Sequence, residues 1–245
     1  MAKLAIVIYS TYGHVAALAE SVKAGIESVG SSATILQVAE TLDAKTLELI
    51  HAPAKPDYPI VKAEDLTNYD GYLFGFPSRF GSFPAQINAF TDSTGGLWAS
   101  GALYHKPAGF FISSGTPGSQ EITARSVLNF FVHHGLIYVP LGFGKAGAQL
   151  SNIEEVHGGS VWGAGAFAGA DGSRAVSQLE KDLAHIQGSE FAIAASKLAP
   201  SAPAAASTAV KEAVAETAAK ADVATTTAAT KAEAPKSESG CCTIV

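Results

Sequence analysis

Three short polar stretches of the sequence each follow an apolar run and carry residue types that suit a phosphate and a flat ring. The first reads Ser10-Thr11-Tyr12-Gly13-His14 and is followed by Val15. It opens directly into a helical pattern, so its hydroxyls and backbone N–H groups would lie at the positive end of a helix dipole and suit a phosphate monoester. It lacks the Gly-Lys-Ser/Thr ending of a nucleoside triphosphate loop and the GxGxxG pattern of a dinucleotide site. The alternative is an ordinary strand-to-helix turn capped by Ser10 or Thr11.

The other two stretches are equally small and polar. They read Gly75-Phe76-Pro77-Ser78-Arg79-Phe80-Gly81-Ser82 and Ser113-Ser114-Gly115-Thr116-Pro117-Gly118-Ser119-Gln120. Their backbone N–H groups and the Arg79 guanidinium can surround the polar edge of a heterocycle, while Phe80 and Tyr12 offer apolar faces. This combination favours flavin mononucleotide (FMN) over ATP, and donors at the pyrimidine edge would favour the electron-rich reduced ring. Taken singly, Arg79 could instead be a surface ion-pair partner and Phe80 a core residue.

The elements that must position these stretches alternate between two periodicities. Short apolar runs rich in β-formers predict strands at residues 4–9, 33–38, 72–76, 108–113 and 136–139. Helical patterns separate most of them, at residues 15–29, 84–90, 120–134 and 178–198. Such alternation predicts an α/β fold of the flavodoxin-like, doubly wound type, with a five-stranded parallel sheet and helices on both faces. Ligands bind beyond the carboxyl ends of the strands in such a sheet, which is where the three polar stretches lie.

Composition divides the chain and excludes some partners. Of the 245 residues, 47% are apolar, which is enough for a sizeable core, and we expect one folded domain over residues 1–198. Residues 199–240 are almost entirely Ala, Ser, Thr, Pro, Lys and Glu, which predicts a disordered tether. The formal net charge of −6 and the lack of any Lys/Arg cluster argue against nucleic acid as a partner. No apolar run approaches the roughly 18 residues of a spanning helix, so the body is expected to be cytoplasmic.

The 2 cysteines, Cys241 and Cys242, are adjacent in the final five residues. No disulfide framework or Cys-based zinc site is therefore expected, and we assign no metal. Residues 242–245 have the shape of a CaaX lipidation motif, although valine is an unusual last residue, and Cys241 could take a second lipid. Two lipid chains would anchor the protein peripherally at the cytoplasmic face of the plasma membrane. An unmodified tail is the alternative.

Six longer motifs carry a family resemblance. They read YSTYGH, FGFPSRFG, FTDSTGGLWASGALYHK, SSGTPGSQE, HHGLIYVPLGF and AGADGSR. Residues 3–198 resemble the tryptophan-repressor-binding-protein-like family of NAD(P)H:quinone oxidoreductases, a tetrameric branch of the flavodoxin-like FMN proteins, and its fungal members above all. The glycine-rich insertion at residues 144–174 is also a family feature, and its lack of periodicity predicts a loop.

The resemblance implies roles for individual residues. It implies FMN contacts at Ser10, Thr11, Tyr12, Gly13, His14, Val15, Ser78, Arg79, Phe80, Ser113, Ser114, Gly115, Thr116, Pro117, Gly118 and His133. It further implies that Tyr12 and Trp98 meet the nicotinamide or the quinone, in a site completed by neighbouring subunits. Without the resemblance, His133 would be interpreted as a helix-end cap and Trp98 as a buried anchor.

Some positions depart from the family pattern. Pro117 stands where many members have glycine, which removes one backbone N–H from a loop that faces the flavin. Val161 and Trp162 replace a common Pro-Tyr pair, so these positions bear on the choice of substrate.

The activity implied by the resemblance is a two-step reduction of quinones to hydroquinones. NADH or NADPH first reduces FMN, and a quinone then takes the same place, in a homotetramer (or dimer) that serves in oxidative-stress protection. No nucleophile is needed, and His133 is the one titrating candidate near the flavin. The alternative is an FMN-binding scaffold or stress-signalling protein at the membrane, with weak or incidental reductase activity.

Overall fold

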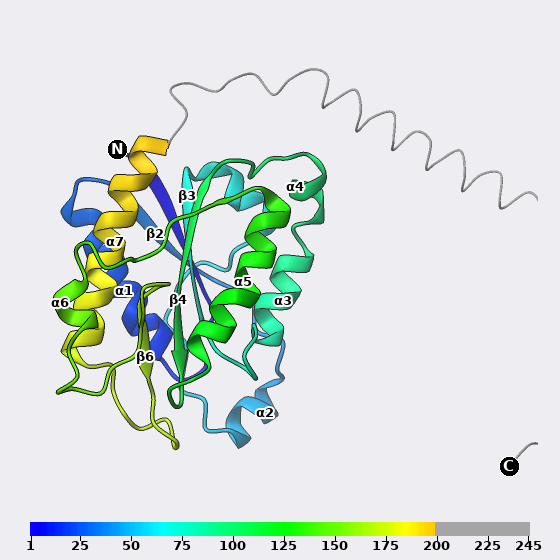
Figure 1. Cartoon of the computed structure of the whole chain (residues 1–245). Coiled ribbons are helices and arrows are strands. Elements are labelled where there is room, and N and C mark those ends of the chain that lie inside the picture. Colours follow the sequence, from blue (N-terminus) through cyan, green and yellow to red (C-terminus); the bar gives the residue numbers. More distant parts are fainter. Residues whose placement is uncertain (199–245) are drawn as a thin grey trace, which may run out of the picture. The chain divides into compact units, whose positions relative to one another are not determined.

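A computed structural model describes residues 1–198, in which a parallel sheet lies between two layers of helices (Figure 1). The strands are β1 (Lys3–Ile8), β2 (Ser32–Gln37), β3 (Gly71–Pro77), β4 (Pro107–Ser114), β5 (Ile137–Tyr138) and β6 (Gly165–Phe167). Their order is β2-β1-β3-β4-β5, with β6 paired to β4, and every pairing is parallel. This is the flavodoxin-like order, so the predicted fold is confirmed, and each predicted strand overlaps an observed one.

The central strand β1 shows why the sheet is covered on both faces. Its side chains alternate, so that Leu4, Ile6 and Ile8 enter one hydrophobic cluster while Ala5 and Val7 enter the other. All five are fully buried. A short run of consecutive apolar residues is therefore what a strand between two helical layers requires.

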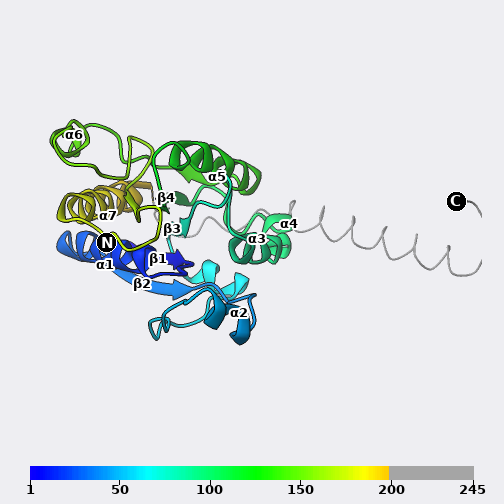
Figure 2. The same cartoon turned by 90° about the horizontal axis from the view of Figure 1, so that it is seen from below.

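The four long helices supply those two layers. Helices α1 (His14–Ser28) and α7 (Gln178–Leu198) cover one face, and α3 (Ala85–Asp92) and α5 (Gln120–His134) cover the other (Figures 1 and 2). The bounds of α5 and α7 agree with the predicted helices at 120–134 and 178–198. The short elements α2 (Ala44–Leu49), η1 (Ala63–Asn68), α4 (Gly95–Ala99) and α6 (Gly147–Leu150) were not predicted, because four to six residues are too few to show a helical period.

Helices α1 and α7 approach each other through glycine. A Cβ on Gly25 would lie 2.0 Å from the carbonyl oxygen of His185, and a Cβ on Gly188 would lie 2.1 Å from that of Val22. Any side chain at either position would push the helices apart. This contact fixes α7 against α1. It thereby also fixes the start of α7, where the preceding segment ends.

The insertion at residues 144–174 corrects the prediction of a plain loop, since it contains α6 and β6. Glycine explains both the strand and the failure to predict it. Cβ atoms on Gly163 and Gly165 would lie 2.2 Å from the Phe110 oxygen and 2.6 Å from the Ile112 oxygen, both on β4. The insertion can therefore lie against β4 only with glycine at these positions, although glycine carries no strand signal in the sequence.

The predicted tether at 199–240 and the lipidation motif at 241–245 fall outside the described residues. Among residues 1–198, no helix combines the length and the apolar character needed to cross a bilayer.

Candidate functional site

A cleft of about 270 Å³ lies at the carboxyl ends of β1, β3 and β4. The strand order reverses here, because the chain passes from β1 outward to β2 and returns to β3 on the other side. The cleft is lined by Ser10, Thr11, Tyr12, His14, Val15, Pro77, Arg79, Ser113, Ser114, Gly115, Ala168, Gly169, Ala170, Asp171 and Gly172. Four loops, each following a strand, therefore contribute to one site.

The first loop presents an anion site at the start of α1. Gly13 adopts a left-handed conformation with φ of 92°, and its N–H donates to Ser10 Oγ over 3.1 Å. Within residues 1–198, the backbone N–H groups of Thr11 and Tyr12 meet no acceptor. The first turn of α1 adds further unpaired N–H groups and the positive end of the helix dipole. The Tyr12 hydroxyl donates to the Ile50 oxygen over 3.1 Å, which holds this side chain at the rim.

The second loop is a tight hairpin at the end of β3. Arg79 and Ser82 exchange backbone hydrogen bonds of 3.0 and 2.9 Å, and the two residues between them, Phe80 and Gly81, have φ of 52° and 73°. Two positive φ angles define a type I′ turn, which ordinarily takes Asn or Gly at its first position. Phe80 is instead strained and fully exposed at the tip, a combination typical of functional loops. Arg79 reaches into the cleft and donates from Nη2 to Thr11 Oγ1 over 3.3 Å.

The third and fourth loops are joined by β6. The N–H groups of Ala168 and Gly169 donate to the oxygens of Ser114 and Gly115 over 2.8 and 3.0 Å, continuing the β4–β6 pairing into the cleft. Asp171, also on the fourth loop, accepts from the N–H and the hydroxyl of Ser173 at 3.1 and 2.8 Å. The backbone hydrogen bond from Ser173 lowers the pKa of Asp171, and both Asp171 and Arg79 line the cleft.

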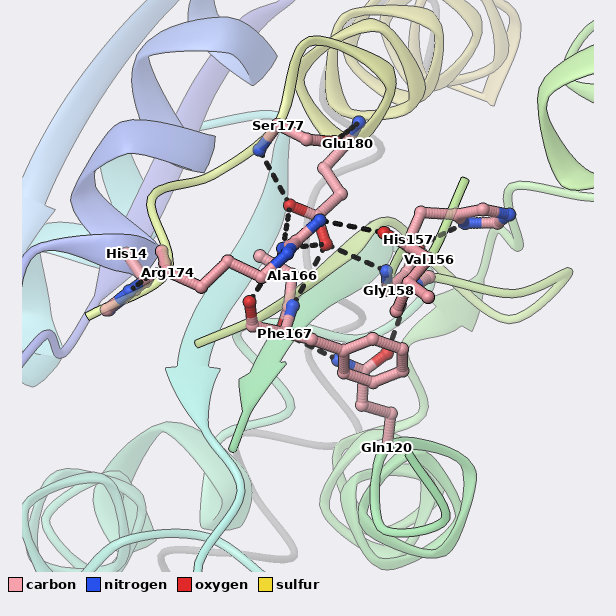
Figure 3. A network of polar contacts seen from close by, with 11 residues as sticks. His14, Gln120, Val156, His157, Gly158, Ala166, Phe167, Arg174, Ser177 and Glu180 are labelled. Carbon is pink, nitrogen blue, oxygen red and sulfur yellow. Dashed lines mark hydrogen bonds and ion pairs between the residues drawn. The ribbon is translucent and has the colours of Figure 1, made fainter. Parts of the chain in front are cut away.

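A buried carboxylate behind the fourth loop holds it in place (Figure 3). Glu180, on α7, is fully buried and accepts from Arg174 Nη1 at 2.9 Å to each oxygen. It also accepts from the N–H groups of Gly158, Phe167 and Ser177 at 2.9, 3.0 and 2.8 Å. This Glu180 network therefore satisfies both carboxylate oxygens and joins the insertion, β6 and α7.

The same network reaches the cleft through the Arg174 backbone. His14 Nε2 lies 2.9 Å from the Arg174 oxygen, and because a carbonyl only accepts, Nε2 must carry the hydrogen. His14 lines the cleft at the start of α1, so the first and fourth loops are tied together there (Figure 3). Glu180 was not predicted as a site residue, although its spacing from Leu183 and Ala184 places it on the inward face of α7, where a lone charged residue signals a buried partner.

The structure brings most of the predicted residues of the three stretches together. Those that line the cleft are Ser10, Thr11, Tyr12, His14, Val15, Arg79, Ser113, Ser114 and Gly115. The others, which belong to the same loops without lining it, are Gly13, Ser78, Phe80, Thr116, Pro117 and Gly118. Ser78 Oγ, for example, lies 2.7 Å from Thr123 Oγ1, which itself donates to the Ser119 oxygen, so Ser78 donates away from the cleft. The lining residues at 168–172 were not predicted, because the strand that precedes them, β6, was not predicted.

Trp98 and His133 lie elsewhere in the chain. They line a second hollow of about 360 Å³, together with Thr91, Asp92, Thr94, Gly95, Phe130 and His134. Helix α5 begins beside the cleft, and the 15 residues that lead to its far end place His133 roughly 20 Å away at about 1.5 Å per residue. One chain therefore does not bring His133 or Trp98 to its own cleft.

His134, beside His133, is buried and its tautomer follows from its partner. Thr94 Oγ1 donates to the Thr91 oxygen over 2.6 Å, so the 2.9 Å contact between Thr94 Oγ1 and His134 Nε2 needs the hydrogen on nitrogen. Burial lowers the pKa of His134, and the neighbouring His133 lowers it further. His134 is therefore neutral at physiological pH.

Comparison with known proteins gives one family match, two similar relatives and one similar solved structure. Residues 5–149 match a family model described as NADPH-dependent FMN reductase. The chain is 58% identical over 190 residues to "NAD(P)H quinone oxidoreductase PST3" of Candida albicans, covering 77% of this chain and 96% of that protein. It is 54% identical over 191 residues to "Protoplast secreted protein 2" of Saccharomyces cerevisiae, covering 78% of this chain and 96% of that protein. A solved structure of a flavodoxin, WrbA-like protein from Agrobacterium tumefaciens superposes with a TM-score of 0.55 at 20% identity, covering 80% of this chain and 99% of that chain, which shows the shared fold.

Proposed function

The chain belongs to the NADPH-dependent FMN reductase family, and on that basis we propose that it is an FMN-dependent NAD(P)H:quinone oxidoreductase. The observation that carries the proposal is the four-loop cleft at the reversal of strand order, with unpaired N–H groups at one end and a guanidinium beside them. The high identity to a named quinone oxidoreductase across 96% of that protein's length supports the same activity.

The donors in the cleft fit FMN. A phosphate needs N–H donors and a positive dipole, which the loop at residues 10–15 and the start of α1 supply. A flavin ring needs donors along its pyrimidine edge, which Arg79 and the backbone at residues 113–115 supply. Asp171 can accept from ribityl hydroxyls. When bound, FMN takes up two electrons from NADH or NADPH and delivers them to a quinone.

The protein's own contribution is to bind and orient. In this proposal residues 10–15 hold the phosphate, residues 78–80 and 113–118 line the ring, and Tyr12 at the rim contacts the nicotinamide or the quinone. No side chain needs to act as a nucleophile. Trp98 and His133 reach the cleft from a neighbouring subunit of a homotetramer (or dimer), which accounts for two aromatic residues that lie far from their own chain's cleft.

The proposal extends to location and physiological role. We propose lipid attachment at Cys241 and Cys242, peripheral association with the cytoplasmic face of the plasma membrane, and a role in oxidative-stress protection. Two adjacent cysteines ahead of Thr243, Ile244 and Val245 support the lipidation. Mass spectrometry of these cysteines in protein from its native cell tests it, and bare thiols on both would contradict it.

The activity is tested by spectroscopy of the purified protein loaded with FMN. We expect NADH or NADPH to bleach the flavin absorbance without air and benzoquinone to restore it rapidly. Slow bleaching at full FMN occupancy would instead indicate a binding scaffold with incidental reductase activity. Failure to bind FMN at all would overturn both interpretations.

A further inference from the structure

A carboxylate outside the cleft, Glu40, accepts hydrogen bonds from residues in four separate segments of the chain. Glu40 lies beyond the end of β2, the strand that pairs with β1. It accepts from Tyr9 Oη at 3.1 Å, Gln86 Nε2 at 2.8 Å, the N–H groups of Thr41 and Leu42 at 2.9 and 3.0 Å, and Lys55 Nζ. Because every partner is a donor, Glu40 is held as a carboxylate.

Its protonation state follows from those contacts. Burial alone would raise the pKa of Glu40, but the hydrogen bonds from Lys55, the Leu42 N–H and Gln86 outweigh it and lower the pKa to about 2. Burial raises the pKa of Tyr9, so its hydroxyl keeps its proton. Lys55 Nζ also lies 4.5 Å from the centroid of the Tyr9 ring, which fixes the ring from its face.

The hydroxyls of Tyr9 and Thr11 connect Glu40 to the cleft, and each hydrogen bond along this path is donated toward Glu40. Tyr9 Oη uses its one hydrogen to donate to Glu40. In its contact with Thr11, Tyr9 Oη is therefore the acceptor, and Thr11 Oγ1 donates to it over 3.4 Å. Thr11 Oγ1 in turn presents its lone pairs to Arg79 Nη2 at 3.3 Å. We call Tyr9 and Thr11 the hydroxyl relay. Both residues are buried, while Arg79 is exposed at the cleft.

Arg79 depends on this contact. It stands on a two-residue hairpin, it forms no ion pair within residues 1–198, and the bond to Thr11 is the one side-chain hydrogen bond it makes there. A free arginine side chain would lose rotamer entropy when it binds a ligand. A guanidinium that is already oriented loses less.

We propose that Glu40 is a positioning residue for Arg79, acting through the hydroxyl relay to hold the guanidinium where its remaining N–H donors face the ligand. The proposal rests on the proposed function, because it assigns those donors to the pyrimidine edge of FMN. It also adds the ends of β2 and α3 to the elements that determine flavin affinity, although neither Glu40 nor Gln86 lines the cleft.

Tyr9→Phe tests the relay, since it removes one hydroxyl and keeps the buried ring. We expect FMN, titrated by quenching of its fluorescence, to bind about three- to tenfold more weakly, as for one lost hydrogen bond. If the reduced form loses up to tenfold more affinity than the oxidised form, the two-electron midpoint potential falls by up to about 30 mV. Tyr58→Phe is the matched control, because Tyr58 also donates to a glutamate, Glu20 at 2.5 Å, away from the cleft.

A double-mutant cycle separates positioning from general damage to the fold. In an Arg79→Met background, Tyr9→Phe should lose its effect on FMN affinity, because the group that the relay orients is gone. An equal loss with and without Arg79 would overturn the proposal. So would a Tyr9→Phe variant with unchanged affinity and potential.

Thr11 supplies a second test of the same chain of bonds. Thr11→Val should reproduce the loss and Thr11→Ser should restore most of it, since serine returns the hydroxyl. Equal affinity in both variants would also overturn the proposal. Wild-type binding and quinone reduction report on the proposed function separately, so a failure there is distinguishable from a failure of the relay.

Discussion

Glu40 is a partly buried side chain whose charge is stabilised by hydrogen bonds from its neighbours. Its neighbours donate hydrogen bonds that outweigh the effect of burial on its pKa, so the ionised form is favoured. Glu180 also has both oxygens occupied by hydrogen bonds, from one arginine and three backbone N–H groups. Each glutamate therefore joins segments that are far apart in the sequence and lie near the cleft.

The lowered pKa of Glu40 makes a prediction about acid stability. Its pKa falls from the ordinary 4.5 to about 2 on folding, so its ionisation stabilises the folded state above the unfolded pKa. That contribution should be lost as the pH falls from 4.5 toward 2. Urea unfolding followed between these pH values should show a smaller decline for Glu40→Gln than for the wild type. Parallel declines would show that Glu40 is not the group responsible.

At the scale of elements, the fourth loop depends on contacts that cross the insertion. Strand β6 is short, and its pairing to β4 involves three residue pairs, so the strand alone cannot fix residues 168–172. The Glu180 network anchors β6 to α7, and α7 is in turn packed on α1 through Gly188. The Glu180 network therefore holds the segment after β6 against α7 (Figure 3).

Glu180→Gln tests this anchoring. The change leaves the Arg174 charge without its buried partner and turns one acceptor oxygen into a donor that faces backbone N–H groups. We expect a loss of about 3–5 kcal/mol in the free energy of unfolding. Below the unfolding temperature, faster hydrogen exchange should appear at residues 158–172.

The exposed pair of Lys23 and Glu27, 3.9 Å apart on α1, provides the control. Glu27→Gln should cost no more than about 0.5 kcal/mol, as surface pairs do. If Glu180→Gln cost as little, the anchoring role would be wrong.

At the scale of the whole molecule, residues 1–198 carry two separate hollows, the cleft and the hollow that Trp98 and His133 line. The cleft lies at the carboxyl ends of the strands, and the hollow with Trp98 and His133 lies near the far end of α5. Under the proposed assembly, each complete site combines the cleft of one subunit with the hollow of another.

Mixed assemblies test this arrangement. Arg79→Met disables the cleft and Trp98→Ala disables the hollow, so each variant alone should reduce quinone slowly. Co-refolded subunits should recover activity, up to about a quarter of the wild-type value by random pairing, because some sites receive an intact cleft and an intact Trp98. The measurement is quinone reduction across a series of mixing ratios. Activity that merely equals the sum of the two variants would contradict a shared site.

Much of the fold could be predicted because its signals are local. Apolar runs and helical periods each span a few consecutive residues, and the rule that ligands lie beyond parallel strands then places three polar stretches together. The first stretch, with Ser10 and His14, and the third, with Ser113, could be assigned to one site in this way. The helical periodicity of the sequence also predicted the first and last residues of α5 and α7.

The sequence by itself thus determined the doubly wound order and most of the cleft, since both follow from periodicity and from the shared edge of parallel strands. The tertiary structure alone decided which distant residues meet. Glu40 bonds to Tyr9 across 31 positions and to Gln86 across 46, and Arg79 bonds to Thr11 across 68. Such pairs leave no mark on local periodicity, because their geometry is set by the crossovers that bring strand ends side by side. Strand β6 and the fourth loop were likewise decided by the tertiary structure alone. The glycines that permit their close backbone packing have no side chains, so they produce no periodic pattern in the sequence.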